Sequence, residues 1–177
     1  NAGETYATGL PLLVSDRDDG LAIVDYESGE VVQNITDANG QEIGISGDGR
    51  IAAVQSRISA SDRLNVYDVA TGEELLEERE STFDGSIRNP LANGNVVVAA
   101  GADTVIGFGV TPGDPDASGD QIWSTGHGTG ELAKSPDETM VAFCSGMDLY
   151  ILDFETGDEL HVVEGFTDDH PRGIDFG

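Results

Sequence analysis

The chain has 177 residues, of which 34 are acidic and 8 are basic, so its formal net charge is -26. This charge excludes the basic surface that nucleic-acid binding requires, because such proteins neutralise phosphates with Lys and Arg. The apolar runs are too short to cross a bilayer as a helix, and the length suits one domain.

Short apolar segments separated by turns occur along the whole chain and predict β-strands. The first three are expected at residues 10–15, 21–25 and 31–35. Later groups are expected at 51–55, 64–69 and 74–78, at 95–100, 104–110 and 121–123, and at 139–144, 149–154 and 160–163. In the three later groups the last strand is more polar, which is typical of the edge of a sheet.

One turn motif, Asp-x-x-Ser/Thr-Gly followed by an acid, recurs at a regular spacing. It begins at Asp25, Asp68 and Asp153, which are 43 and 85 residues apart, and Gly113 keeps its glycine midway along the longer interval. A period in the forties is typical of a β-propeller blade, a small sheet that must stack against its neighbours to bury its faces. We therefore predict an all-β protein, a β-propeller of four four-stranded antiparallel blades.

The two ends of the chain are complementary within this repeat. Residues 10–36 supply a second, third and fourth strand, whereas residues 171–177 have the pattern of a first strand. We expect the C-terminal strand to join the N-terminal blade and close the ring, because closure removes the open sheet edges. The single domain, residues 1–177, would then contain blades at 10–36 with 171–177, 41–80, 86–124 and 130–165. Two alternatives stay open: a homodimer that completes an eight-bladed ring, and a piece of a longer chain.

The turns also carry a family resemblance. Gly126 and His127, the turn at residues 135–137, and Asp153 at the end of a strand resemble a WD40 repeat, with Leu152 in the place of its Trp. The Asp-x-x-Thr-Gly turn is also similar to the repeats of PQQ-like quinoprotein propellers and of YVTN-type surface and lactonase-like propellers. The WD40 resemblance implies an interaction scaffold, the quinoprotein and lactonase resemblances imply an enzyme with an axial cofactor or metal, and the YVTN resemblance also fits a cell-surface or adhesion module.

The resemblances also suggest roles for single residues. In WD40 relatives a His, a Ser or Thr, an Asp and a Trp form a hydrogen-bonded tetrad, and here His127 and Asp148 match two of its positions. Trp123, the only tryptophan, is placed as in the docking motif of quinoprotein propellers, in which a Trp caps the next blade. That resemblance implies a structural role for Trp123.

An acidic loop is the candidate metal site. Residues 114–120 begin like a calcium loop, with oxygen-bearing side chains on Asp114, Asp116, Ser118 and Asp120. The twelfth position of that loop is Thr125, where calcium loops have a bidentate Glu, so the ligand set is incomplete. A solvated hairpin insertion without a metal is the alternative that we favour.

Other groups for catalysis are sparse. The histidines, His127, His161 and His170, do not have the close spacing of a metal pair, and no Gly-x-Ser-x-Gly nucleophile elbow is present. Cys144 lies in an apolar strand and is expected to be a core residue. We therefore assign no catalytic residue and no cofactor.

The charge balance indicates the environment. Lys134 is the only lysine, beside seven arginines, and this composition resembles that of proteins from extreme halophiles. At molar salt the Debye length falls to about 3 Å, so surface carboxylates no longer repel one another strongly. We predict a non-enzymatic scaffold for protein–protein interaction in the cytoplasm or on the surface of a halophile. Its partner is a protein, and it has no nucleic-acid partner and no membrane span. The alternatives are a propeller enzyme, either a quinoprotein or a lactonase-like hydrolase, and a cell-surface or adhesion module.

Overall fold

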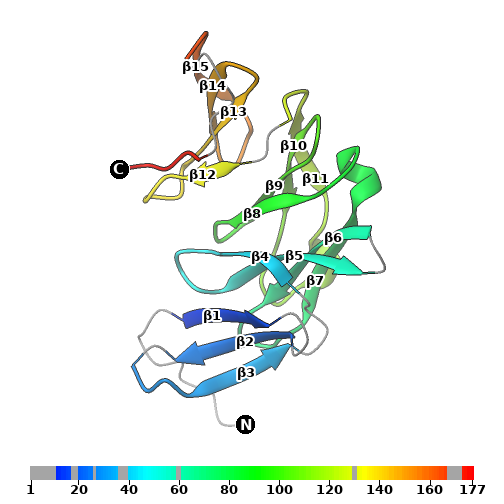
Figure 1. Ribbon diagram of the computed structural model, residues 1–177. Helices are drawn as coiled ribbons and strands as arrows, with labels where there is room; N and C mark the ends of the chain where they lie inside the picture. Colours follow the sequence, from blue (N-terminus) through cyan, green and yellow to red (C-terminus); the bar gives the residue numbers. More distant parts are fainter. Residues whose placement is uncertain are drawn as a thin grey trace.

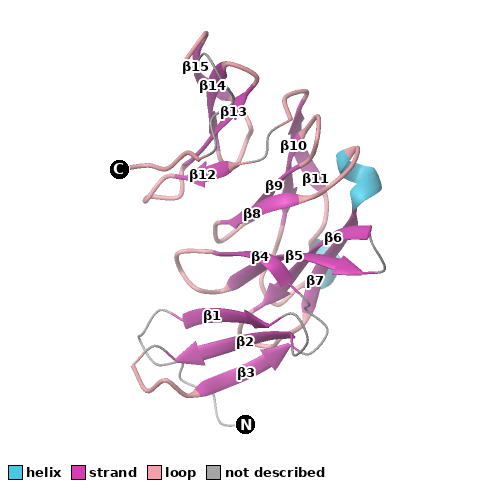
Figure 2. Ribbon diagram, viewed as in Figure 1, coloured by secondary structure: helices cyan, strands magenta, loops and turns pink. Residues whose placement is uncertain are grey.

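The computed structural model describes residues 11–16, 20–25, 27–35, 40–58, 61–128, 131–166 and 173–177. In these residues the chain forms fifteen β-strands and two short 3-10 helices (Figure 2). Among them we find no helix with the length and apolar character needed to span a membrane. All strand pairs within the four sheets are antiparallel, so the predicted all-β class is confirmed.

The first two sheets are built from consecutive strands. The first sheet has the order β1 (Pro11–Asp16), β2 (Gly20–Asp25) and β3 (Val31–Ile35). The second sheet has the order β4 (Gly40–Ile45), β5 (Ile51–Ile58), β6 (Ser61–Asp68) and β7 (Glu74–Arg79). The short helix η1 (Glu80–Phe83) leads from β7 to the third sheet.

The third and fourth sheets repeat the same meander. The third sheet has β8 (Arg88–Ala92), β9 (Val96–Ala100), β10 (Val105–Gly109) and β11 (Gln121–Thr125), with the helix η2 (Pro115–Ala117) between its last two strands. The fourth sheet has β12 (Leu132–Lys134), β13 (Met140–Ser145), β14 (Asp148–Asp153) and β15 (Glu159–Val163). Three of the sheets are thus four-stranded, and the first has three strands in the part described.

The four sheets follow one another in a row, with the first and the fourth at its two ends (Figure 1). Strand β5 shows how the sheets are held together, because successive side chains of a strand point to opposite faces. Ala52 and Val54 pack in a cluster with Leu21 and Ile23 of the first sheet. The alternate residue Ile51 packs in a second cluster that includes residues of the third sheet.

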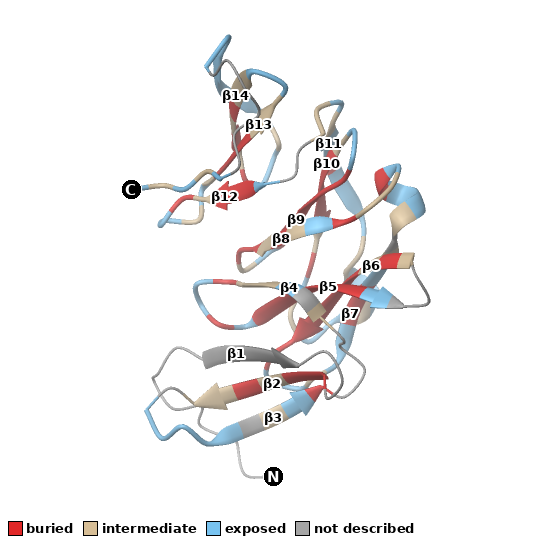
Figure 3. Cartoon of the chain, viewed as in Figure 1, coloured by how far each residue is buried: buried red, intermediate tan, exposed pale blue. Residues whose placement is uncertain are grey.

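A third apolar layer joins the third and fourth sheets. Val98 and Val105 of the third sheet pack in one cluster with Phe143 and Leu152 of the fourth. These side chains are fully buried, and the buried segments lie mainly along the middle strands of the sheets (Figure 3). Burial of a large apolar side chain contributes about 1.5–3 kcal/mol. The three layers are therefore the principal source of stability of the row of sheets.

The repeated Asp of the turn motif forms the turn itself. The Oδ1 atom of Asp68 accepts hydrogen bonds from the backbone N–H groups of Ala70 (2.8 Å) and Thr71 (2.9 Å). Asp153 binds the corresponding N–H groups, and the Oδ1 atom of Asp25 accepts one from the Ser28 N–H at 2.7 Å. The Ser28 hydrogen bonds, first that of the backbone N–H and then that of the hydroxyl, lower the pKa of Asp25 from its ordinary value.

The glycine of the same motif makes room for the preceding sheet. Gly157 has a φ of +72°, and a Cβ atom there would lie 2.6 Å from the Trp123 ring. The Nε1 atom of Trp123 donates a hydrogen bond to the backbone oxygen of Phe154 at 3.2 Å. Trp123 of the third sheet thus rests on the turn of the fourth. Gly72 provides the same space for Gln33 of the first sheet.

The structure does not show the expected closure of the ring by the C-terminal strand. Residues 173–177 form no strand and lie beside the fourth sheet (Figure 1), where residues 173–176 line a hollow together with residues of β13 and β14. Ile174 and Phe176 are half-buried there, because the fourth sheet presents an apolar face. Residues 10, 17–19, 26, 36, 171 and 172 of the expected N-terminal blade lie outside the described residues.

Candidate functional site

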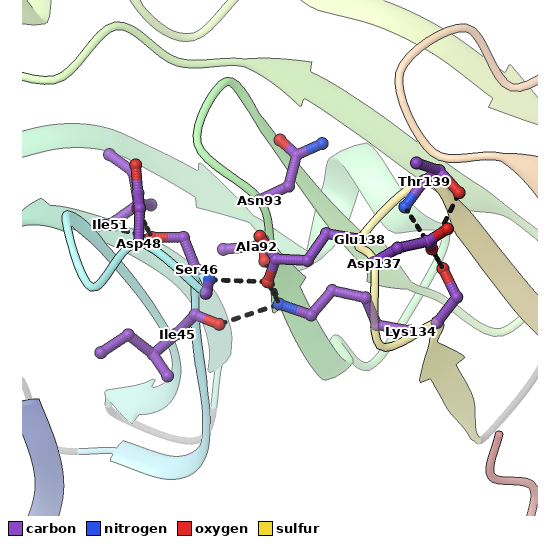
Figure 4. A network of polar contacts seen from close by, with 12 residues as sticks. Ile45, Ser46, Asp48, Ile51, Ala92, Asn93, Lys134, Asp137, Glu138 and Thr139 are labelled. Atoms are coloured by element: carbon purple, nitrogen blue, oxygen red, sulfur yellow. Dashed lines mark hydrogen bonds and ion pairs between the residues drawn. The ribbon is translucent and has the colours of Figure 1, made fainter. Parts of the chain in front are cut away.

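Lys134 ties three sheets together at the ends of their first strands. Its Nζ atom donates hydrogen bonds to the backbone oxygens of Ile45 in β4 (3.0 Å) and Ala92 in β8 (2.5 Å), and it pairs with the carboxylate of Glu138 (Figure 4). Glu138 in turn accepts a hydrogen bond from the backbone N–H of Gly47 at 2.6 Å. One lysine therefore holds together the second, third and fourth sheets.

The residues in this network occupy equivalent positions of the repeat. Ile45, Ala92 and Lys134 each end the first strand of their sheet, immediately before the recurring turn. In the turn after Lys134, the hydroxyl of Ser135 donates a hydrogen bond to Asp137 at 2.6 Å. Hydrogen bonds from Ser135 and Thr139 lower the pKa of Asp137 from its ordinary value. The arrangement is structural, since every group in it has a partner within the protein.

In the sequence, Lys134 is distinctive as the only lysine of the chain. A lysine is distinctive where the equivalent residues are apolar, Ile45 and Ala92, and this contrast is the signal that could have identified it. Its partners, however, are two backbone oxygens and a carboxylate. Every residue has a backbone oxygen, so the sequence does not indicate which of them accept a hydrogen bond. The network can therefore be identified only from the packing of the sheets.

The candidate calcium loop, residues 114–120, surrounds helix η2. Asp114 caps this helix, since its Oδ1 atom accepts the Ala117 N–H at 3.1 Å. The Ser118 hydroxyl donates to the backbone oxygen of Asp114 at 2.9 Å, and both Asp116 and Asp120 are exposed. Among the described residues, no group of three or more His, Cys, Asp or Glu is placed to hold a metal. Calcium binding by this loop stays a prediction to be tested.

The residues of the suggested tetrad have separate partners. The ring of His127 stacks on Tyr150, with centroids 4.2 Å apart, whereas Asp148 accepts a hydrogen bond from the Gly165 N–H at 2.8 Å. Burial raises the pKa of Tyr150, and the nearby acids, Asp148 first, raise it further. His161 is exposed on β15, and His170 lies outside the described residues. The structure therefore does not assemble the tetrad from His127 and Asp148.

The fourth sheet has one face that no other sheet of the chain covers in the described structure. Ala142 and Cys144 of β13 pair with Ile151 and Leu149 of β14, so these four side chains share a face. The alternate residues of both strands pack against the third sheet. We call this surface, formed by Ala142, Cys144, Leu149 and Ile151, the open face.

The open face is only loosely covered. The open face lines a hollow of about 370 Å³ together with Phe166 and the C-terminal residues 173–176. Phe166 and Val163, the register partner of Leu149, are exposed to solvent by 54% and 44%. Of the seven large apolar side chains exposed in the described residues, five fall between positions 147 and 166.

Cys144 contributes to this face as an apolar group. Burial raises the pKa of its thiol, so the thiol is protonated at neutral pH. Because the thiolate is the nucleophilic form, the environment does not activate this cysteine. The expected core position is not observed, because Cys144 is half-buried, belongs to none of the three apolar clusters and lines the hollow beside the open face.

No family model and no curated protein matches this chain. Its structure is similar to that of KlAtg21 in a complex with the coiled coil of AgAtg16, with a TM-score of 0.66 and 12% identity over 91% of this chain and 54% of that one. It is also similar to BamB from Moraxella catarrhalis, a β-propeller, with a TM-score of 0.61 and 18% identity over 89% of this chain and 46% of that one.

A designed protein is a third similar structure. The computationally designed Ika8 protein matches with a TM-score of 0.66 and 15% identity, over 97% of this chain and 51% of that one. At these identities the likeness concerns the fold alone, which is propeller-like. The chain spans about half the length of the solved structures that it matches.

Proposed function

We propose that this protein is a non-enzymatic, propeller-like scaffold for protein–protein interaction, and that the open face of its fourth sheet is the docking surface. The observation that carries the proposal is this apolar face, with the exposed side chains of Val163 and Phe166 beside it, on a chain with a net charge of -26. A large exposed apolar patch marks an interaction site in soluble proteins, because water contact with it is unfavourable. The similar KlAtg21 structure, which contains a coiled-coil partner, supports an interaction role.

The partner that fits this face best is a second copy of the chain. Within the chain, sheets stack face to face through apolar rows at three successive layers. The far side of the first sheet carries the half-buried Ala22 and Val24, which alternate with Leu21 and Ile23 of the layer between the first and second sheets. The fourth sheet of one copy can therefore stack on the first sheet of the other.

Two such contacts would close a ring of eight sheets. A head-to-tail contact used twice closes on itself when the two copies are related by a two-fold axis. Two copies of this chain together have about the length of one matched propeller-like chain, since those chains are about twice as long as this one. The acidic surface further suggests that this assembly operates at high salt, as in a halophile, where screening allows two such acidic chains to associate.

The oligomeric state tests the proposal. We expect light scattering coupled to size-exclusion chromatography, at about 1 M KCl to shorten the Debye length, to give twice the chain mass of 18.5 kDa. Ile151→Glu places a charge on the open face and should yield the monomer. Ile122→Glu, at an exposed position of the third sheet, is the matched control and should leave the dimer intact. A wild-type chain that is monomeric at all concentrations, or a ring that closes with four sheets, would show that the second copy is not the partner.

A further inference from the structure

A second hollow, of about 500 Å³, lies between the second sheet and the connection from η1 to β8. It forms where the apolar layer between the second and third sheets ends. Along one face of β5 the residues run Ile51, Ala53, Gln55 and Arg57, so the row that begins apolar ends polar. The buried side chain of Ile87 also lines this hollow. We call this feature the polar hollow.

The side chain of Gln55, a residue that is otherwise buried, lines the polar hollow. Gln55 is 4% exposed, and its side chain forms no hydrogen bond with any described residue. A carboxamide offers two N–H donors and one oxygen acceptor. The amide of Gln55 is therefore available to a polar molecule in the hollow.

Two arginines supply positive charge at the same place. Arg57 and Arg88 both line the hollow, although the whole chain has only seven arginines and one lysine. The Nε atom of Arg57 lies 3.7 Å from the carboxylate of Asp62, and that of Arg88 donates to the Ser86 hydroxyl at 3.4 Å. In the described structure the terminal nitrogens of both guanidinium groups have no protein partner. Guanidinium nitrogens bind carboxylates in a bidentate geometry, through two parallel hydrogen bonds.

Acidic groups lie on the other walls. Glu42 accepts the Asn89 N–H at 2.5 Å, and Glu80 accepts the Asp62 N–H at 3.1 Å. Each carboxylate oxygen can accept more than one hydrogen bond, so both residues keep capacity for an ammonium group. The hollow thus offers donors for a carboxylate and acceptors for an ammonium. A ligand that carries both charges is neutral overall and is not repelled by the net charge of -26.

We propose that the polar hollow binds a small zwitterion of the α-amino-acid type. The carboxylate of the ligand contacts Arg57 and Arg88, its ammonium contacts Glu42 and Glu80, and Gln55 hydrogen-bonds to either group. The volume of about 500 Å³ lies in the range of small-molecule sites. This proposal is independent of the open face, because it concerns a different surface between the second and third sheets.

Calorimetric titration with three probes at about 1 M KCl tests this proposal, with the salt fixed so that screening stays constant. L-alanine carries both charges, acetate only the carboxylate and ethylammonium only the ammonium. We expect saturable binding of L-alanine with one site per chain, and binding of the two single-charge probes that is at least about tenfold weaker, since each lacks one charged hydrogen-bonding group.

Variants assign the binding to the hollow. Arg88→Gln and Gln55→Met should each weaken L-alanine binding at least about tenfold, because each removes hydrogen bonds to a charged ligand. Arg88 is exposed, and Met keeps the volume of Gln while removing the amide, so both variants should fold. Arg50→Gln removes the same charge from an exposed position outside the hollow and should bind as the wild type does. The proposal is overturned by an absence of saturable L-alanine binding, by equally tight binding of acetate, or by unchanged binding in both hollow variants.

Discussion

Replacing Lys134 by Met should weaken the whole row of sheets, because one ammonium group serves three of them. The side chain is 17% exposed, and its partner Glu138 is 22% exposed. Removal of one member of a buried ion pair costs about 3–5 kcal/mol, and hydrogen bonds to charged groups contribute about 1.5–3 kcal/mol. For this partly buried group we therefore expect a loss of about 2–3 kcal/mol in the free energy of unfolding, which is within the range for hydrogen bonds to charged groups and no higher than the bottom of the range for a buried ion pair.

Urea unfolding at constant KCl concentration measures this loss without changing the ionic strength. With a denaturant slope of about 2 kcal/mol per molar urea, the unfolding midpoint of Lys134→Met should fall by about 1 M. Arg50→Met is the control, since it removes the same charge from an exposed side chain and should change stability by no more than about 0.5 kcal/mol. If the two variants unfold at the same urea concentration, the network does not stabilise the packing of the sheets and the reasoning is refuted.

Three further predictions concern salt, the repeated turn and the acidic loop. The unfolding temperature should rise steeply from low to molar KCl, because screening removes the repulsion among 34 acidic residues, and a flat profile would contradict this. Gly157→Ala should destabilise the protein more than Gly29→Ala in thermal unfolding. Both positions have a positive φ, but only at Gly157 does the added Cβ meet Trp123. If the two variants lose the same stability, the contact between Gly157 and Trp123 has no stabilising role. At fixed ionic strength, millimolar Ca²⁺ should have the same small effect on the wild type and on Asp114→Asn with Asp116→Asn. A calcium-dependent gain above about 1 kcal/mol that the double variant loses would instead identify a metal site.

The strands and the recurring turns could be predicted from the sequence, because both depend on local chemistry. An Asp that accepts backbone N–H groups and a Gly at positive φ are needed wherever this turn occurs, so Asp68 with Gly72 and Asp153 with Gly157 mark the same corner in two sheets. Alternating apolar residues mark strands for an equally local reason, because each strand buries its faces separately. The all-β class and the order of the strands were therefore predictable.

Apart from the contact of Trp123, which its resemblance to a docking motif indicated, the contacts between sheets could not be predicted, because they join residues that are distant in sequence. The Nζ atom of Lys134 binds the backbone oxygens of Ile45 and Ala92, which any residue would offer. The amide of Gln55 and the guanidinium of Arg88 come to one hollow only through the packing of the second and third sheets. The C-terminal residues matched a strand pattern, yet they line the hollow beside the open face, since the pattern of Ile174 and Phe176 specifies an apolar side but not which sheet receives it. Sequence alone determined the repeating unit and its turns, whereas the tertiary structure decided which surfaces are left for partners, because stacking depends on the shapes and charges of whole faces.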